Sequence, residues 1–143
     1  MGNYIDPSDI ESSLSDQELE QLVEDEEEGF INVETNQTIL QKIKAAESMI
    51  DSYLRERYRV PIQNPPAVIS EMALTITVYR LKLRRSFVDE AVAEDYSDTV
   101  KRLEAFAEGR ATLPGDHITE GSDEAFRGFS ETTNAVFNGS QFI

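Results

Sequence analysis

The most restrictive feature of the sequence is an apolar residue that returns every three or four positions from Thr35 to Tyr58. This spacing places side chains on one face of an α-helix. Thr35 or Asn36 can cap the start of the helix, and Pro61 stands just beyond its end. The expected apolar face consists of Ile39, Ile43, Ala46, Ile50, Tyr53 and Leu54. The pattern therefore predicts a long amphipathic helix that must bury one side.

Two further helices with the same spacing are expected, from about Ala67 to Arg85 and from Asp89 to just before Gly109. Pro65 and Pro66 suit the first turn of the earlier one, and Asp89 suits the N-terminal end of the later one. The expected apolar faces are Val68 or Ile69, Met72, Ile76, Tyr79 and Leu83, and then Val92, Tyr96, Val100, Leu103 and Phe106 or Ala107. Three such helices joined by short links predict an all-α fold, a small helical bundle without a sheet in its core.

The ends of the chain differ from this middle. A short helix is expected through Ile10 and Leu14, followed by a second that Ser15 and Glu18 begin as a capping box. Beyond Gly109 the helical spacing is lost, and Gly, Ser, Thr and Asn dominate. We therefore expect a helical domain over residues 1–109, with an acidic N-terminal region, and an extended C-terminal tail over 110–143. Its spaced aromatic residues are candidate anchors on a partner subunit: Phe126, Phe129, Phe137 and Phe142.

Charge is unevenly distributed along the chain, whose net charge is −15. Residues 1–41 contain twelve acidic side chains and no Lys or Arg, whereas residues 42–109 contain eleven of each sign. An acidic surface does not bind nucleic acid by neutralising phosphates. Cysteine is absent, which excludes disulfides and thiol chemistry, and no apolar run is long enough for a bilayer, so no membrane anchor or signal peptide is expected.

The string IDSYLRERY, Ile50 to Tyr58, followed by Val60-Pro61-Ile62, resembles the signature of a family of Mu-like phage and prophage proteins found at the head–tail junction. The similarity covers roughly Tyr4 to Leu113 and includes Ala45-Ala46 before the signature and Asp95-Tyr96 after it. The positions that match the signature are Asp51, Tyr53, Leu54, Arg57, Tyr58 and Pro61.

This resemblance implies a head–tail connector, or neck adaptor, without enzymatic activity or cofactor. Such a protein forms a ring, expected to be a dodecamer, beneath the portal and around the channel through which double-stranded DNA passes. The implied partners are other copies of the chain, the portal protein and a downstream neck or tail-completion protein, with DNA passing but not specifically bound. The implied location is the neck of the virion, with assembly in the host cytoplasm.

The signature residues have mainly structural interpretations. Asp51 and Arg55 have the i,i+4 spacing of a weak ion pair on one helix. Tyr53, Leu54 and Tyr58 are expected to pack in the core or at the helix end, which Pro61 terminates. For Arg57, packing and an interface role are about equally favoured.

Two charged clusters each have more than one interpretation. Arg80, Lys82, Arg84 and Arg85 either complement the dipole at a helix C-terminus, which is slightly favoured, or receive the acidic N-terminal region of a neighbouring subunit. The acidic run Glu24, Asp25, Glu26, Glu27 and Glu28 is a solvated loop, a lining of the DNA channel or a docking site for a basic partner. It lacks the oxygen spacing and the central glycine of a calcium loop.

The sequence gives little support to an enzymatic function. The single histidine, His117, lies in the predicted tail without a nucleophile beside it, and no Glu-x-x-His pair is present to hold metals in a bundle. The main alternative to a connector is an acidic DNA mimic that blocks a nucleic-acid-binding protein. Mimicry requires acids spread along one surface, whereas here they concentrate in one third of the chain.

Overall fold

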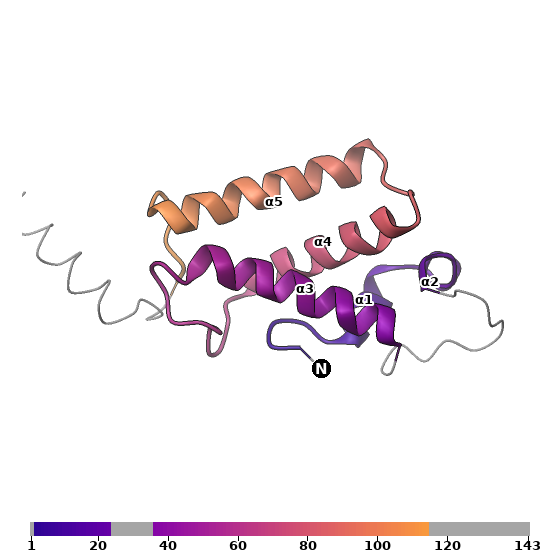
Figure 1. The fold of residues 1–143 in the computed structure, drawn as a ribbon, viewed down its shortest axis with the longest axis horizontal. Helices are drawn as coiled ribbons and strands as arrows, with labels where there is room; N and C mark the ends of the chain where they lie inside the picture. Colours follow the sequence, from indigo (N-terminus) through magenta and orange to yellow (C-terminus); the bar gives the residue numbers. More distant parts are fainter. Residues whose placement is uncertain (1, 24–35, 115–143) are drawn as a thin grey trace, which may run out of the picture.

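A computed structural model describes residues 2–23 and 36–114 of the chain (Figure 1). This part contains five helices and no β-strand, so the predicted all-α fold is confirmed for it. The helices are α1 (Pro7–Ser13), α2 (Asp16–Val23), α3 (Gln37–Leu54), α4 (Ala67–Arg84) and α5 (Glu90–Glu108). The predicted tail beyond residue 114 and the acidic run Glu24 to Glu28 lie outside the described residues.

The helix ends follow the local signals of the sequence. The Asn36 side chain accepts a hydrogen bond from the Ile39 amide at 3.0 Å, and the Asp89 side chain accepts one from the Val92 amide at 2.9 Å. Both side chains satisfy an amide that has no partner within the helix. The capping box is confirmed as well, because Ser15 and Glu18 each accept a hydrogen bond from the other's amide at 3.1 Å.

Glycine ends α5 for a conformational reason. Gly109 has a φ of 85°, in the left-handed region that side chains with a Cβ rarely adopt. This turn lets the Arg110 amide donate to the Ala105 carbonyl at 2.9 Å, which satisfies an acceptor at the helix end.

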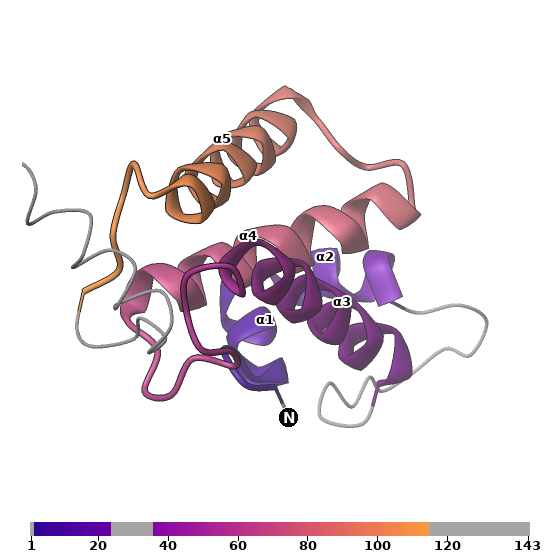
Figure 2. The ribbon, with the colours of Figure 1, turned by 60° about the vertical axis from the view of Figure 1, so that its left-hand side comes forward.

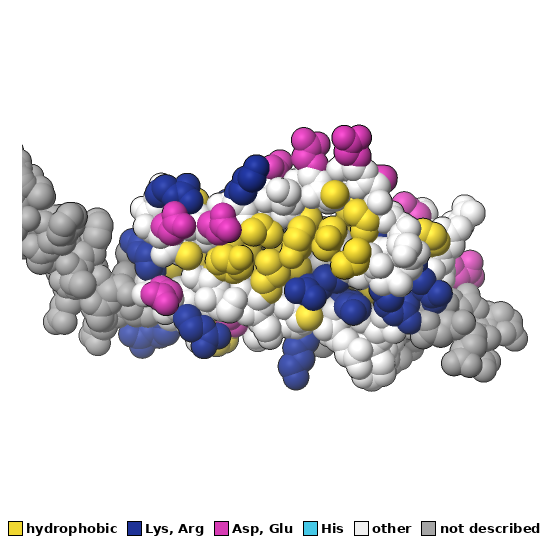
Figure 3. Space-filling view, turned by 45° about the horizontal axis from the view of Figure 1, so that its top comes forward, with side chains coloured by type: hydrophobic (Ala, Val, Ile, Leu, Met, Phe, Trp, Pro, Cys, Tyr) yellow, Lys and Arg dark blue, Asp and Glu magenta, His cyan; other side chains and the backbone are white. Residues whose placement is uncertain are grey.

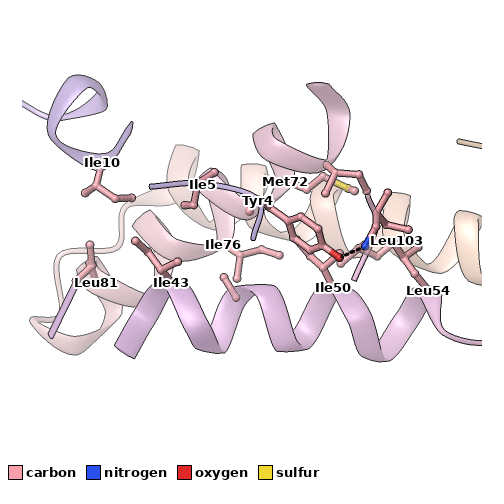
Figure 4. Close-up of a cluster of buried hydrophobic side chains, with 14 of the residues drawn as sticks. Tyr4, Ile5, Ile10, Ile43, Ile50, Leu54, Met72, Ile76, Leu81 and Leu103 are labelled. Carbon is pink, nitrogen blue, oxygen red and sulfur yellow. Dashed lines mark hydrogen bonds between the residues drawn. The ribbon is translucent and has the colours of Figure 1, made fainter. Parts of the chain in front are cut away.

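The helices are arranged in layers around α4 (Figure 2). Helix α5 lies on one side of the α3–α4 pair, and α1 and α2 pack on the other. Helix α4 contacts each of the other four helices. The core extends from Ile10 of α1, past Ile43 and Ile50 of α3 and Ile76 of α4, to Leu103 of α5, and all of these side chains are buried (Figure 4).

Two details of the structure refine the expectations from the sequence. Leu113 lies beyond the predicted domain boundary at Gly109, yet it is buried and its amide donates to the Tyr58 hydroxyl at 3.1 Å. The helical body therefore extends through Leu113. Leu83 was assigned to a buried face, yet it is 54% exposed, because the last turn of α4 is covered on the side of the buried Leu81 and not on the side of Leu83.

Candidate functional site: the N-terminal clasp and the helical surface

The first described residues are held against α3 by one buried carboxylate. Glu47, only 6% exposed, accepts hydrogen bonds from the amides of Asn3 at 3.0 Å, Tyr4 at 2.7 Å and Ile5 at 3.2 Å. Hydrogen bonds to an ionised acceptor are shorter and stronger than neutral ones. The Glu47 carboxylate therefore supplies these amides with the hydrogen-bond acceptors that a neighbouring strand or a helix turn would otherwise supply.

Tyr4 connects this segment to three other parts of the fold. Its hydroxyl donates to the Asp51 carboxylate at 2.5 Å. The same hydroxyl accepts from the Ile62 amide at 3.0 Å, which is the dashed line in Figure 4. Its carbonyl accepts from the Ser70 hydroxyl of α4 at 2.9 Å. We call residues 3–5 with Glu47, Asp51, Ile62 and Ser70 the N-terminal clasp. It joins the start of the chain to α3, to the α3–α4 loop and to α4.

The clasp leaves no room for a side chain at position 2. A Cβ on Gly2 would collide with a carboxylate oxygen of Glu47 and with the Ile5 carbonyl. Because the carbonyl belongs to the backbone and Glu47 is held by three amides, neither neighbour can easily move. Glycine therefore allows the close approach on which the clasp depends.

Burial changes the protonation of the Tyr4–Asp51 pair. Burial raises the pKa of the Tyr4 phenol well above its usual range, and the hydrogen bond to Asp51 raises it further. Burial also raises the pKa of the Asp51 carboxyl, as does the nearby charge of Glu47, against the opposing effects of Tyr4 and Arg55. Both shifts favour the protonated form in the folded state.

Tyr4→Phe should make this linkage measurable. A raised pKa in the folded state means that the stabilising contribution is fully present below the ordinary tyrosine pKa of about 10 and is lost as the pH rises. At neutral pH the variant should lose roughly 1–3 kcal/mol, since the Ile62 amide loses its acceptor. Denaturant unfolding from pH 7 to about pH 11 should show this difference shrinking. Tyr53→Phe, at a half-buried tyrosine, is the matched control, and a constant Tyr4→Phe difference across the range would contradict the linkage.

The signature residues make most of their described contacts within the chain. Leu54 and Tyr58 are buried, and the half-buried Tyr53 packs against the core. The Arg57 guanidinium donates to the Phe106 carbonyl of α5 at 3.4 Å and lies 5.6 Å from the centre of the Tyr58 ring. Asp51 accepts from Tyr4. Pro61 is exposed and follows a cis peptide bond.

The four basic residues at the end of α4 point to different neighbours. Arg84 and Arg85 donate to the Leu22 carbonyl at the end of α2, at 2.9 and 3.5 Å. Arg80 lies 3.8 Å from the Met49 sulfur of α3, and Lys82 lines a hollow beside α4. That this cluster contacts the acidic N-terminal region of a neighbouring subunit therefore stays a prediction. The tail aromatics Phe126, Phe129, Phe137 and Phe142, and His117, lie outside the described residues.

An apolar band crosses one face of the molecule (Figure 3). Both acidic and basic side chains lie around its edges. Half-buried aromatic side chains join α4 to α5: Tyr79 of α4 stacks on Tyr96 of α5 at 3.9 Å between ring centres, and the Met49 sulfur of α3 lies 3.8 Å from the Tyr96 hydroxyl. Leu83 lies one turn beyond Tyr79 and is 54% exposed, and Phe87, in the turn after α4, is 50% exposed.

Two classes of feature are absent from the described residues. Within residues 2–23 and 36–114, His, Cys, Asp and Glu side chains form no group of three suited to holding a metal ion. None of the described helices is both long and apolar enough to cross a membrane.

Comparison with known proteins connects these features to a family. Residues 4–130 match the family model described as Bacteriophage Mu, Gp36. The chain belongs to this family. The resemblance read from the signature is thus confirmed, and the match covers nearly all of the described body, from the clasp to beyond Leu113.

A relative within the Gp36 family is the Mu-like prophage FluMu protein gp36 of Haemophilus influenzae, 36% identical over 75 residues. The aligned region covers 52% of this chain and 52% of the relative, so the chain spans about half the length of the curated relative it matches. Membership in the Gp36 family makes this chain a protein of the Mu-like phage and prophage type.

Proposed function

We propose that this chain is a head–tail connector that forms a ring beneath the portal and around the DNA channel, and so joins head to tail. The observation that carries the proposal is the Gp36 family match over residues 4–130, which spans the helical body. The signature residues that suggested the connector lie inside this match and tie α3 to α5 and to the start of the chain.

The proposed partners are other copies of the chain, the portal protein and a downstream neck or tail-completion protein. The net charge of −15 is compatible with a channel, because a basic lining would bind phosphates and retain the passing duplex. The apolar band is compatible with assembly, since apolar side chains gathered on a surface favour contact with another protein.

The same charge also favours a second candidate, an acidic DNA mimic that occupies a nucleic-acid-binding protein. Its acids are concentrated in residues 1–41, while residues 42–109 carry eleven charges of each sign. A duplex presents charge along its whole length. The distribution therefore supports a connector more than a mimic.

Mass measurement of the purified full-length protein, alone and with its portal protein, separates the two. We expect native mass spectrometry and electron microscopy to show a closed ring, a dodecamer, that binds the portal coaxially. The gene's removal should leave filled heads and free tails that do not join. If the protein stays monomeric in the presence of the portal and instead binds a nuclease or repressor, the connector proposal fails and the DNA mimic takes its place.

A further inference from the structure

A groove runs along the side of α4 that faces away from α3. Three adjoining hollows of about 300, 280 and 410 Å³ form it. They adjoin because they share lining residues: Glu71 lines the first and third, Leu74 the second and third, and Thr75 and Asp95 the first and second. The groove therefore follows α4 from Ser70 to Lys82, more than three turns at 3.6 residues per turn, with α1 on one side and α5 on the other.

The groove combines an apolar floor with an acidic rim. Leu74 and Val78 of α4, Leu14 and Val92 contribute apolar surface. Its charged lining consists of Asp9, Glu18, Glu71, Asp95 and Asp98 against Lys82 and Arg102. Five acids against two bases give a negative groove, suited to an apolar projection carried by a basic surface.

Two exposed apolar side chains at the end of the same helix, Leu83 and Phe87, offer such a projection. Leu74 and Leu83 are nine residues apart in α4, about two and a half turns at 3.6 residues per turn, so they point in opposite directions. Leu83 and Phe87 are the large apolar side chains most exposed among the described residues. Arg84 and Arg85 place positive charge at this end of α4.

We propose that Leu83 and Phe87 of one copy enter the α4 groove of the next copy in the ring. This inference rests on the proposed connector function. Two complementary surfaces on different faces of one molecule make a head-to-tail contact, which closes into a ring when the rotation between copies allows it. The apolar groups fill the groove, and the basic end of α4 lies beside the acidic rim.

Two sets of variants test the two halves of this contact. Leu83→Asp with Phe87→Asp alters the projection, and Leu74→Asp alters the groove floor. Glu71→Arg with Asp95→Arg is a second groove variant that changes only exposed side chains and so avoids a folding defect. Ala93→Asp, at an exposed position on the same helix as Asp95, is the matched control. Circular dichroism checks that each variant keeps its helices.

Each altered protein is expected to lose the ring and to have the mass of a monomer, while Ala93→Asp keeps the ring. Mixing the projection variant with a groove variant gives the sharper result. One protein retains an intact groove and the other an intact projection, so the mixture should form a one-to-one complex with twice the monomer mass and nothing larger. A contact in which the same patch meets itself would not be rescued in this way.

The outcomes separate this inference from the function on which it rests. If the parent protein forms no ring alone or on the portal, the connector proposal fails and the inference with it. If the parent forms a ring and the folded variants do so too, only the inference is overturned. If the variants keep the ring but no longer bind the portal or a tail protein, these surfaces belong to that partner and the inference is overturned. A mixture that forms no complex would overturn it as well.

Discussion

Glu47→Leu should unfold the start of the chain and destabilise the whole helical body. Three amides, those of Asn3, Tyr4 and Ile5, lose their acceptor, and those of Tyr4 and Ile5 are buried. A buried donor left without a partner costs about 1–3 kcal/mol, so the two buried amides alone give an expected loss of about 2–6 kcal/mol. That is a large share of the roughly 5–15 kcal/mol that stabilises an ordinary domain. Urea unfolding at neutral pH measures it.

Glu94→Leu supplies the control, because it makes the same replacement at an exposed position of α5. Surface changes of this kind usually alter stability by no more than about 0.5 kcal/mol. Glu47→Gln should fall between the two, since an amide oxygen still accepts hydrogen bonds but carries no charge. Hydrogen exchange should locate the damage first at residues 3–5. If Glu47→Leu unfolds like Glu94→Leu, the clasp contributes little to stability.

Deletion of residues 121–143 should abolish incorporation of the protein into phage particles while leaving the helices intact. Leu113 is the last residue of the described core, and none of the described core contacts requires the deleted segment. The segment contributes Phe126, Phe129, Phe137 and Phe142, spaced as anchors for another protein surface. Circular dichroism should therefore be almost unchanged, whereas complementation of a gene-deleted phage should fail.

A variant of full length distinguishes the aromatic anchors from the length of the tail. Replacement of the four phenylalanines by serine keeps all 143 residues and should reproduce the assembly defect. Asp116→Asn, in the tail but outside the deleted segment, should assemble normally. If the truncated protein is incorporated normally, the tail is not an anchor. The proposed ring would then depend on contacts of the helical body alone.

Local features could be predicted from the sequence because they depend on residues that lie close together along the chain. Helical spacing and the caps at Asn36, Ser15 and Asp89 located the helices to within a few residues, since each involves groups no more than four positions apart. The signature from Ile50 to Tyr58 likewise indicated the family, because it is a contiguous string. The apolar faces were less accurate at the ends of helices, where Leu83 fits the spacing but no helix covers it.

The clasp was decided by tertiary structure alone. Glu47 accepts from an amide 43 positions away and Ser70 donates to a carbonyl 66 positions away, and no periodicity relates such residues. The sequence suggested an ion pair between Asp51 and Arg55, but the folded chain brings the Tyr4 hydroxyl to Asp51. The α4 groove and the exposed Leu83 have the same origin. Spacing assigns a residue to a face of its helix, whereas only the packing of α1, α2, α3 and α5 around α4 decides which faces are covered and which remain for another molecule.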